Sequence, residues 1–264
     1  MKRYSHKYSI ILDNIDLHQY KLRPVSAISY IQDSFARYTA TKGFAAYDLF
    51  PKNLYWIVSE FNINFVADLP YWSEEIETQI WISEISKLKL YTDYQLLYKG
   101  EVFAKGNACW FVINTESKRP AKTDIFENKF EICSDLTLGE HKKFTLAETT
   151  EQISSITHTN NLSDIDFNNH VNNKSYINLA ELTAPEEFQD THMLRELNIK
   201  FNKETFLGDI LKATTYKTSE QNYFVHKITK GETDVCDITT RWENKKSDIN
   251  TNILEYDLSV KTEK

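Results

Sequence analysis

A polar stretch in the second half of the chain, SDIDFNNHVNNKSY at 163–176, holds the residues best suited to chemistry. Asp166, Asn168 and His170 stand at i, i+2 and i+4, and alternate side chains of an extended segment point to the same face. The three side chains are therefore predicted to project together toward one cleft. Because an unperturbed histidine titrates near ~6.5, His170 could move a proton at neutral pH. Asp166 could orient it, and Asn168 could donate an uncharged hydrogen bond.

A helix is predicted to begin directly after this group of residues, over 171–182. Its first backbone N–H groups and the positive end of its dipole would face the same cleft, where they could hold an oxyanion formed from an ester or thioester carbonyl. A structural interpretation stays open for the neighbouring polar residues, because Asn and Asp before a helix commonly serve as caps and turns. We interpret Asn172 and Asn173 as caps, and Asp164 as part of a solvated turn.

A fourth polar candidate is Glu204, in the segment KFNKETFLGD at 200–209. It follows an apolar strand pattern, so it is either an exposed charge at a strand end or a carboxylate that the sheet positions to polarise water opposite His170. Other chemistries find little support in the sequence. It contains no GxGxxG, no phosphate loop and no GxSxG, and the histidines lack metal-ligand spacing, so neither a cofactor nor a metal is expected.

The composition is that of a folded, reduced and acidic protein. The 264 residues are 41% hydrophobic and 13% aromatic, which suffices for a substantial core. A net charge of −7 argues against a general nucleic-acid binder, although a local basic patch could still meet an acidic partner. The three cysteines form no CxxC pair, which fits a cytoplasmic protein. Neither a signal peptide nor an apolar run of the ~20 residues that a membrane span needs is visible.

The polar residues must be positioned by the helices and strands of the rest of the chain. These predicted elements follow the same order twice. Apolar and aromatic patterns predict the order strand, helix and four strands twice. In the first half the predicted elements are a strand at 3–12, a helix at 25–41 and strands at 54–65, 75–85, 88–98 and 101–113. In the second half they are a strand at 153–159, the helix at 171–182 and strands at 193–202, 209–218, 223–230 and 233–243.

Local sequence supports a duplication. The segment FNINF at 61–65 matches LNIKF at 197–201, and SYI at 29–31 matches SYI at 175–177. An α+β plan in which an antiparallel sheet wraps one long helix is called the hotdog, and each half would bury its helix against its own sheet. The predicted fold class is therefore a tandem, or double, hotdog. Two α+β domains that share the pattern by chance are the alternative.

The two halves differ at the polar stretch. When they are aligned on Tyr30 and Tyr176, His170 falls opposite Pro24, and only the second half keeps a polar constellation. One chemical site per chain is therefore predicted, in the second half. The predicted organisation is an N-terminal hotdog over 1–125, a linker over 126–152, a C-terminal hotdog over 153–250 and a tail over 251–264.

The stretch at 164–176 closely resembles the D-x-D-x-N-x-H-V-N-N-x-x-Y signature of acyl-acyl-carrier-protein thioesterases, which are known from plant plastids and bacteria. Shorter segments resemble other parts of that family in the same order: NLYWIVS at 53–59, ACWFVIN at 108–114 with the basic turn KRP at 118–120, and FNKE at 201–204. Together they run through most of the chain. The resemblance implies a double hotdog that hydrolyses the thioester between a fatty acyl chain and the phosphopantetheine arm of acyl carrier protein, which ends fatty acid synthesis.

The resemblance assigns catalytic roles to Asp166, Asn168, His170 and Glu204, and it implies an acyl-chain cavity in the first half. Plant members have a cysteine directly after the glutamate, where this chain has Thr205. If the two segments correspond, a cysteine nucleophile is excluded there, and a mechanism through carboxylate and water remains, with or without an acyl-enzyme on Asp166. The chain starts almost at the first strand, which suits a bacterial cytoplasmic form.

The expected partner, acyl carrier protein, is acidic, and this chain is acidic too. Docking would then need a local basic surface, or else these charges are ordinary solvated ones. The candidates by clustering are Lys87, Lys89, Lys118, Arg119 and Lys122. Two other functions stay open: hydrolysis of acyl-CoA, which shares the phosphopantetheine arm, and a non-catalytic protein that binds or senses lipids. We expect a monomer or a homodimer.

Overall fold

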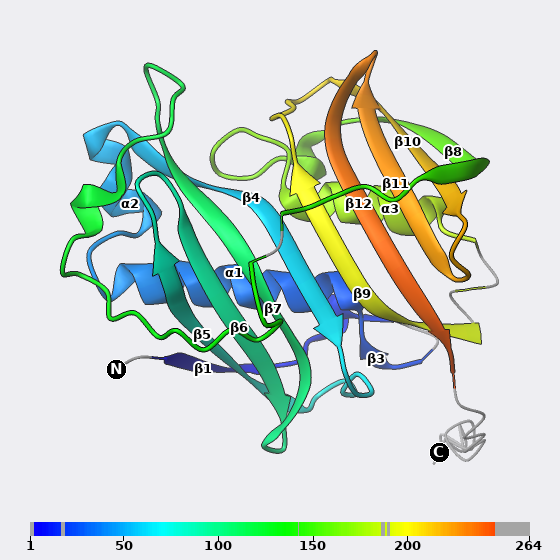
Figure 1. Ribbon diagram of the computed structural model, residues 1–264, viewed down its shortest axis with the longest axis horizontal. Helices are drawn as coiled ribbons and strands as arrows, with labels where there is room; N and C mark the ends of the chain where they lie inside the picture. The colour runs from blue at the N-terminus through cyan, green and yellow to red at the C-terminus, as the bar shows by residue number, and fades with distance from the viewer. Residues whose placement is uncertain (1–2, 17–18, 142, 186–187, 189–190, 246–264) are drawn as a thin grey trace, which may run out of the picture.

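An antiparallel sheet of ten strands dominates the fold, and two helices pack against it (Figure 1). The computed structural model describes residues 3–16, 19–141, 143–185, 188 and 191–245, so the predicted tail at 251–264 lies outside the described residues. The strand order is β1-β5-β6-β7-β4-β9-β12-β11-β10-β8, in which each half of the chain supplies five neighbouring strands. This arrangement confirms the predicted double hotdog.

The first half follows its predicted elements closely. Helix α1 runs over Pro24–Ala40 and has its proline at the first position, where the missing N–H is not needed. Its apolar positions recur at helical spacing and are buried, including Ile28, Ile31 and Phe35. The strands are β1 (Tyr4–Ser9), β4 (Leu54–Phe65), β5 (Glu75–Ile85), β6 (Leu90–Tyr98) and β7 (Glu101–Asn114). The short elements are η1 (Leu12–Asn14), β2 (Ile15–Asp16), β3 (Lys21–Leu22), α2 (Ala46–Leu49) and η2 (Phe50–Lys52).

The second half begins earlier than the sequence predicts. Strand β8 runs over Thr149–Thr159, so it starts inside the segment interpreted as a linker, and it pairs with β10 past two register shifts. Its first residues are exposed on an edge strand and show no apolar alternation, which explains why pattern reasoning missed them. The other elements are η3 (Thr123–Phe126), η4 (Leu162–Asp164), α3 (Asn173–Thr183), β9 (His192–Phe201), β10 (Ile210–Thr218), β11 (Tyr223–Lys230) and β12 (Thr233–Asn244).

The two halves join where the duplicated sequence predicts symmetry. Strands β4 and β9 pair in an antiparallel register, and Asn62 lies opposite Asn198. These two residues are also equivalent in the match between FNINF and LNIKF. The flanking pairs are related to each other by the same symmetry: Phe61 pairs with Ile199, and Ile63 pairs with Leu197. A self-complementary register of this kind is what a two-fold axis between matching strands produces, so the fused halves imitate a symmetric dimer.

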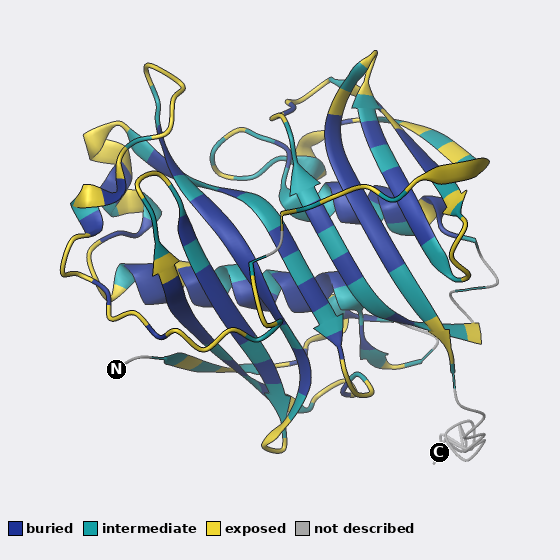
Figure 2. Cartoon of the chain, viewed as in Figure 1, coloured by how far each residue is buried: buried dark blue, intermediate teal, exposed yellow. Residues whose placement is uncertain are grey.

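The core is continuous across both halves, as the buried stripes on the strands and helices show (Figure 2). In the first half, aromatic rings fill the space between α1 and the sheet. Phe35 stacks on Trp110 with ring centroids 3.8 Å apart, and Trp56 stacks on Phe126 at 5.1 Å. All three cysteines are free and buried. Among the described residues, no helix is both long and apolar enough to cross a membrane.

A buried carboxylate, Asp93, is one of the contacts that fasten the segment between the halves to the first half. Asp93 Oδ1 accepts hydrogen bonds from the backbone N–H and the hydroxyl of Thr137, at 2.7 and 2.8 Å. Asp93 Oδ2 lies 2.9 Å from His141 Nε2, and the His141 ring stacks on Tyr91. Asp93 is fully buried, so these contacts replace its lost hydration.

The His141–Asp93 contact makes stability depend on pH. The hydrogen bond to Asp93 raises the pKa of His141 against the effect of burial, and Glu84, 3.6 Å from Nδ1, adds to the rise. A raised histidine pKa means that the contact stabilises the fold fully below the unfolded value of ~6.5, and that this contribution is lost as the pH rises through the folded value.

We therefore expect His141→Gln, which keeps a neutral donor but loses the charge, to lower the free energy of unfolding by roughly 1 kcal/mol at pH 6 and by less at pH 8.5. Urea unfolding at both pH values measures the difference. His6→Gln on β1 is the control for losing a histidine elsewhere. Equal losses at the two pH values would contradict the charged contact.

Candidate active site

The polar stretch folds into a tight loop, and the expectation of an extended segment is wrong. Ile165 and Val171 form an isolated antiparallel bridge, and Asp166 N donates to His170 O at 2.8 Å. Between them, Asn169 adopts a positive φ of 63°, which asparagine tolerates better than most residues. Local hydrogen bonds from Asp and Asn compete with extended backbone and win here.

Asp166 is the residue that closes this loop. Its Oδ1 atom accepts hydrogen bonds from the backbone N–H groups of Asn168 and His170, at 2.8 and 3.3 Å. The carboxylate therefore faces the backbone of the loop, and the predicted contact with the His170 ring is taken by another residue. Asn168 lies in the turn, half-buried beside the same loop.

Asp164 is not part of a solvated turn, contrary to the prediction. Its carboxylate lies 2.8 Å from His158 Nε2 and accepts a hydrogen bond from Asn161 N at 2.9 Å. Burial works against the charge, but the hydrogen bonds from Asn161 and His158 lower the pKa of Asp164 overall. Its backbone oxygen also accepts from Asn172 N at 2.7 Å. Asp164 thus ties the loop both to β8 and to the start of α3.

Fewer backbone N–H groups at the start of α3 are free to bind a ligand than the sequence predicts. Asn172 caps the helix as predicted, because its side chain accepts from Lys174 N at 2.9 Å, whereas Asn173 is the first helical residue and not a cap. The N–H of Val171 donates to Thr205 O at 2.9 Å, and that of Asn172 donates to Asp164. Three N–H groups that the sequence assigned to an oxyanion therefore already have protein partners.

The structure brings His170 and Glu204 together. His170 Nδ1 lies 3.5 Å from Glu204 Oε1, with the two side chains 18% and 36% exposed. The edge of the His170 ring meets the Phe206 ring, with centroids 5.3 Å apart. Thr205 is fully buried and shares a hydrogen bond of 2.7 Å with the Tyr176 hydroxyl. Glu204 is therefore not an isolated charge at a strand end but the carboxylate beside the histidine.

Sequence reasoning missed one residue of this site, Tyr55. It lies on β4 in the first half, yet its hydroxyl donates to Glu204 Oε1 at 3.1 Å, and its ring centroid is 5.9 Å from that of His170. Burial, together with the negative charge of Glu204, raises the pKa of Tyr55 to about 12. Its segment, NLYWIVS, is apolar and strand-like, so only the neighbouring positions of β4 and β9 in the sheet reveal the contact.

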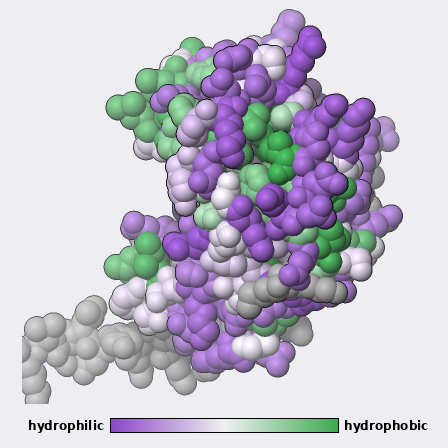
Figure 3. Space-filling model, turned by 90° about the vertical axis from the view of Figure 1, so that its left-hand side faces the viewer, coloured by the Kyte–Doolittle hydropathy of each residue, from purple (hydrophilic) through white to green (hydrophobic). Residues whose placement is uncertain are grey.

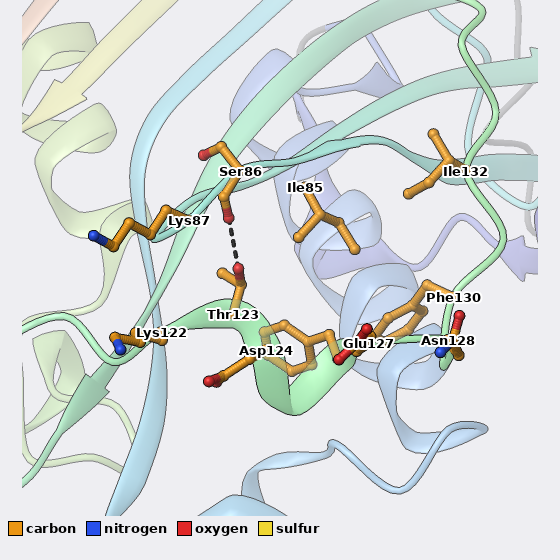
Figure 4. Close-up of a pocket in the computed structure, with 11 residues that line it drawn as sticks. Ile85, Ser86, Lys87, Lys122, Thr123, Asp124, Glu127, Asn128, Phe130 and Ile132 are labelled. Carbon is orange, nitrogen blue, oxygen red and sulfur yellow. Dashed lines mark hydrogen bonds between the residues drawn. The ribbon is translucent and has the colours of Figure 1, made fainter.

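A cavity lies elsewhere in the described part of the chain, in the first half (Figure 4). Its volume is about 530 Å³, and it opens between the end of β5 and η3, where the Thr123 hydroxyl donates to Ser86 O at 2.5 Å. Its apolar wall is formed by Ile85, Phe126, Phe130 and Ile132. None of the four predicted site residues lines it. The end of the molecule formed by the first half is mostly hydrophilic, with apolar patches between (Figure 3).

A metal site is not indicated. Within the described ranges, no group of three or more His, Cys, Asp or Glu side chains could hold a metal ion. The groups that converge are a histidine, a carboxylate and a phenol, with an amide nearby in the loop. These side chains can accept, donate and hold protons around one small molecule such as water, as acid–base catalysis requires.

Comparison with solved structures gives the class of fold to which this chain belongs. The fold matches that of a crystallised acyl-ACP thioesterase from Bacteroides thetaiotaomicron, at a TM-score of 0.79 and 21% identity over 92% of this chain and 98% of that one. It also matches a 12:0-ACP thioesterase from Umbellularia californica, at a TM-score of 0.79 and 16% identity over 93% and 98%. At these identities the likeness establishes the double-hotdog fold.

Sequence families identify the chain further. Residues 1–130 match the acyl-ACP thioesterase N-terminal domain, and residues 147–244 match the C-terminal domain. The chain therefore belongs to the acyl-ACP thioesterase family. Relatives include oleoyl-acyl carrier protein thioesterase 1 of Arabidopsis thaliana, 27% identical over 69% of this chain, and the palmitoyl-acyl carrier protein thioesterase of the same plant, 24% identical over 73%. The chain spans about half the length of these relatives, 53% and 50%.

The loop geometry predicts different effects for two substitutions of Asp166. Asp166→Ala removes the acceptor of two backbone N–H groups and should lower the free energy of unfolding by about 0.5–2 kcal/mol, as loss of a helix cap does. Asp166→Asn keeps a carbonyl oxygen in that place and should cost less than half as much. Urea unfolding of both variants measures this. Equal losses would mean that the charge, and not the acceptor, holds the loop.

Proposed function

We propose that this chain hydrolyses the thioester of fatty acyl-acyl-carrier-protein, releasing a free fatty acid and the carrier thiol. The observation that carries the proposal is the pairing of His170 with Glu204, 3.5 Å apart, in a chain of this family. Family membership supports the substrate class, and the pair supplies the proton-transfer groups that hydrolysis needs. Termination of fatty acid synthesis, in the cytoplasm, is the role that this reaction implies.

The geometry favours water as the nucleophile. With Nδ1–H directed at Glu204, His170 presents Nε2 as the base that takes a proton from water. The water oxygen then bonds to the thioester carbon, the C–S bond breaks, and His170 returns the proton to the leaving thiolate. Direct attack by Asp166 is less favoured, because its Oδ1 atom already accepts two backbone hydrogen bonds. The distance of 3.5 Å is long for a hydrogen bond, and such contacts tighten when substrate binds.

The developing oxyanion needs a donor near this pair. We propose the Asn168 amide for this role, because it is uncharged and lies in the loop that ends at His170. The backbone N–H groups at 171, 172 and 174 are weaker candidates, since each already donates to a protein oxygen. A single preorganised donor of this kind typically contributes about 10²–10³ in kcat.

The acyl chain is proposed to bind in the first half. The cavity of about 530 Å³ beside Phe126 and Phe130 falls in the size range of ligand sites and offers an apolar wall. Aromatic rings fill much of the interior behind it, so the length of chain accommodated depends on how those rings repack. The organisation into hotdogs over 1–125 and 153–250 also stays a proposal.

The proposed mechanism predicts the effect of removing His170. His170→Ala should reduce kcat/KM by about 10²–10⁴ while the fold is retained, because a positioned acid–base group contributes that much. Release of free thiol is measured from acyl carrier proteins loaded with chains of different length, and circular dichroism checks the fold. His6→Ala on β1 is the matched control and should leave turnover unchanged.

The same assay separates the alternatives. Acyl-CoA substrates of equal chain length are run beside the carrier substrates, and a higher kcat/KM for acyl-CoA would reassign the chain to acyl-CoA hydrolysis. Tight binding of acyl carrier protein without turnover by the wild type would favour a lipid-binding protein without catalysis.

The proposed substrate also predicts a docking surface for the carrier. Lys87 and Lys122 project from the same end of the cavity (Figure 4), and Thr123 N donates to Lys87 O at 3.2 Å, so the two lysines belong to one surface. Arg119 and Lys122 are exposed, whereas Lys118 contacts the Tyr55 ring and is unsuitable for a clean test. We propose that this basic surface receives the acidic carrier.

Charge reversal at Arg119→Glu and Lys122→Glu should raise KM for acyl carrier substrates about 10-fold or more at low salt, with kcat retained and the effect shrinking at high salt. The control is Lys212→Glu with Lys227→Glu, which changes the net charge equally on β10 and β11. If both pairs raise KM alike, only the overall charge matters and the docking surface lies elsewhere.

A further inference from the structure

The Glu204 carboxylate is held by side chains from both halves of the chain. Its Oε1 atom accepts a hydrogen bond from the Tyr55 hydroxyl at 3.1 Å and lies 3.5 Å from His170 Nδ1. One hydrogen-bond donor, the Tyr55 hydroxyl, and one nearby imidazole nitrogen therefore meet at a single oxygen atom, and the hydrogen bond restricts the rotation of the carboxylate. Without Tyr55, a side chain that is 36% exposed on an irregular segment could turn toward solvent.

The sheet brings Tyr55 to this place. The last pair between β4 and β9 is Glu60 with Lys200, and β4 begins at Leu54. The first residues of β4 therefore run past the end of β9, alongside the segment that carries Glu204. The junction between the halves thus delivers a first-half side chain to a site whose other members all belong to the second half.

Tyr55 can act only as a donor toward Glu204. The residue is 7% exposed, with the His170 ring on one neighbouring segment and Lys118 Nζ 5.7 Å from its ring centroid. Glu204, His170 and Lys118 are the titratable groups that face it. Since the pKa of Tyr55 is raised to about 12, by burial first and then by Glu204, the phenol stays protonated at neutral pH. A donor to a carboxylate favours the ionised form of that carboxylate.

We propose that Tyr55 is a positioning residue for the reaction: it holds the Glu204 carboxylate aimed at His170 Nδ1, so that His170 keeps Nε2 free for the attacking water. The kinetic consequence rests on the proposed function, whereas the effect on His170 itself does not. In this arrangement the first half does more than hold the acyl chain, because it completes the proton-transfer group of the second half.

The test is Tyr55→Phe, which removes the hydroxyl and keeps the ring. We expect kcat to fall about 10-fold with KM within twofold, and the acid limb of the kcat profile, which reports deprotonation of the base His170, to move to lower pH by on the order of one unit, because the charged form of His170 loses part of its stabilisation by the carboxylate. The matched control is Tyr38→Phe, because the buried Tyr38 hydroxyl has no hydrogen-bond partner among the described residues. A uniform loss at every pH, or no loss, would overturn the proposal.

A double-mutant cycle shows whether Tyr55 acts through Glu204. If it does, adding Tyr55→Phe to Glu204→Gln changes kcat by less than about twofold, because the carboxylate it positions is already gone. Losses that multiply would show that Tyr55 acts on its own and would overturn the inference.

A direct readout separates this inference from the proposed function. The titration of the His170 imidazole is followed by NMR, without substrate, in the wild type and in both single variants. Tyr55→Phe should shift the titration midpoint in the same direction as Glu204→Gln and by less. If that shift appears in a protein without thioesterase activity, the proposed function fails and the role of Tyr55 stands. If turnover is present but neither the NMR midpoint nor the acid limb moves, the role of Tyr55 fails alone.

Discussion

The pairing of β4 with β9 is the contact on which the rest of the structure depends. It makes one sheet from two blocks of five strands, and its register sets Asn62 opposite its own counterpart, Asn198. Because the same strands carry the matched sequences, the junction has the geometry of a symmetric dimer interface inside one chain. The site inherits its position from this register. A slip of two residues would carry Tyr55 away from Glu204 by about 6–7 Å, the rise of two strand residues.

The acidic residues around the loop divide into those that hold backbone and those that face the histidine. Asp164 and Asp166 satisfy N–H groups that a tight turn leaves without partners, and only Glu204 meets a ring nitrogen of His170. This division follows from reach. An aspartate side chain is short and bonds readily to its own loop, whereas a glutamate on a neighbouring segment can extend across the gap. The Asp and Asn residues of this signature therefore serve in large part to fold the loop that carries His170.

Much of the fold could be predicted because its strands alternate or are uniformly apolar; β4, β5 and β11 have the predicted ends. The strand pattern offered Glu204 as a carboxylate opposite His170, and the family resemblance assigned catalytic roles to both, although they lie 34 residues apart in sequence and on different segments. The predictions that failed concerned either local backbone conformation or the order of the strands in the sheet. The exposed edge of β8 gave no pattern, the loop at 166–170 turned where alternation implied extension, and Tyr55 looked like one more aromatic strand residue. Its role depends on which strand lies beside β4, and periodicity contains no information about strand order.

The duplicated halves differ where the second half carries its polar stretch. Asp68 stands three positions after Phe65, as Glu204 stands three positions after the matched Phe201, and its side chain is 72% exposed and lies 3.6 Å from Lys21. The counterpart of His170 is Pro24 at the start of α1. Next to that proline, Arg23 bonds to Glu181 of α3 at 2.6 Å, so the residues around the first-half equivalent of the site now join the two helices. When one copy of a duplicated site has no catalytic role, its residues can instead stabilise the position of the other copy. Tyr55 is a further example. It belongs to the first half, but because it lies on β4, at the junction of the two halves, it reaches the site in the second half.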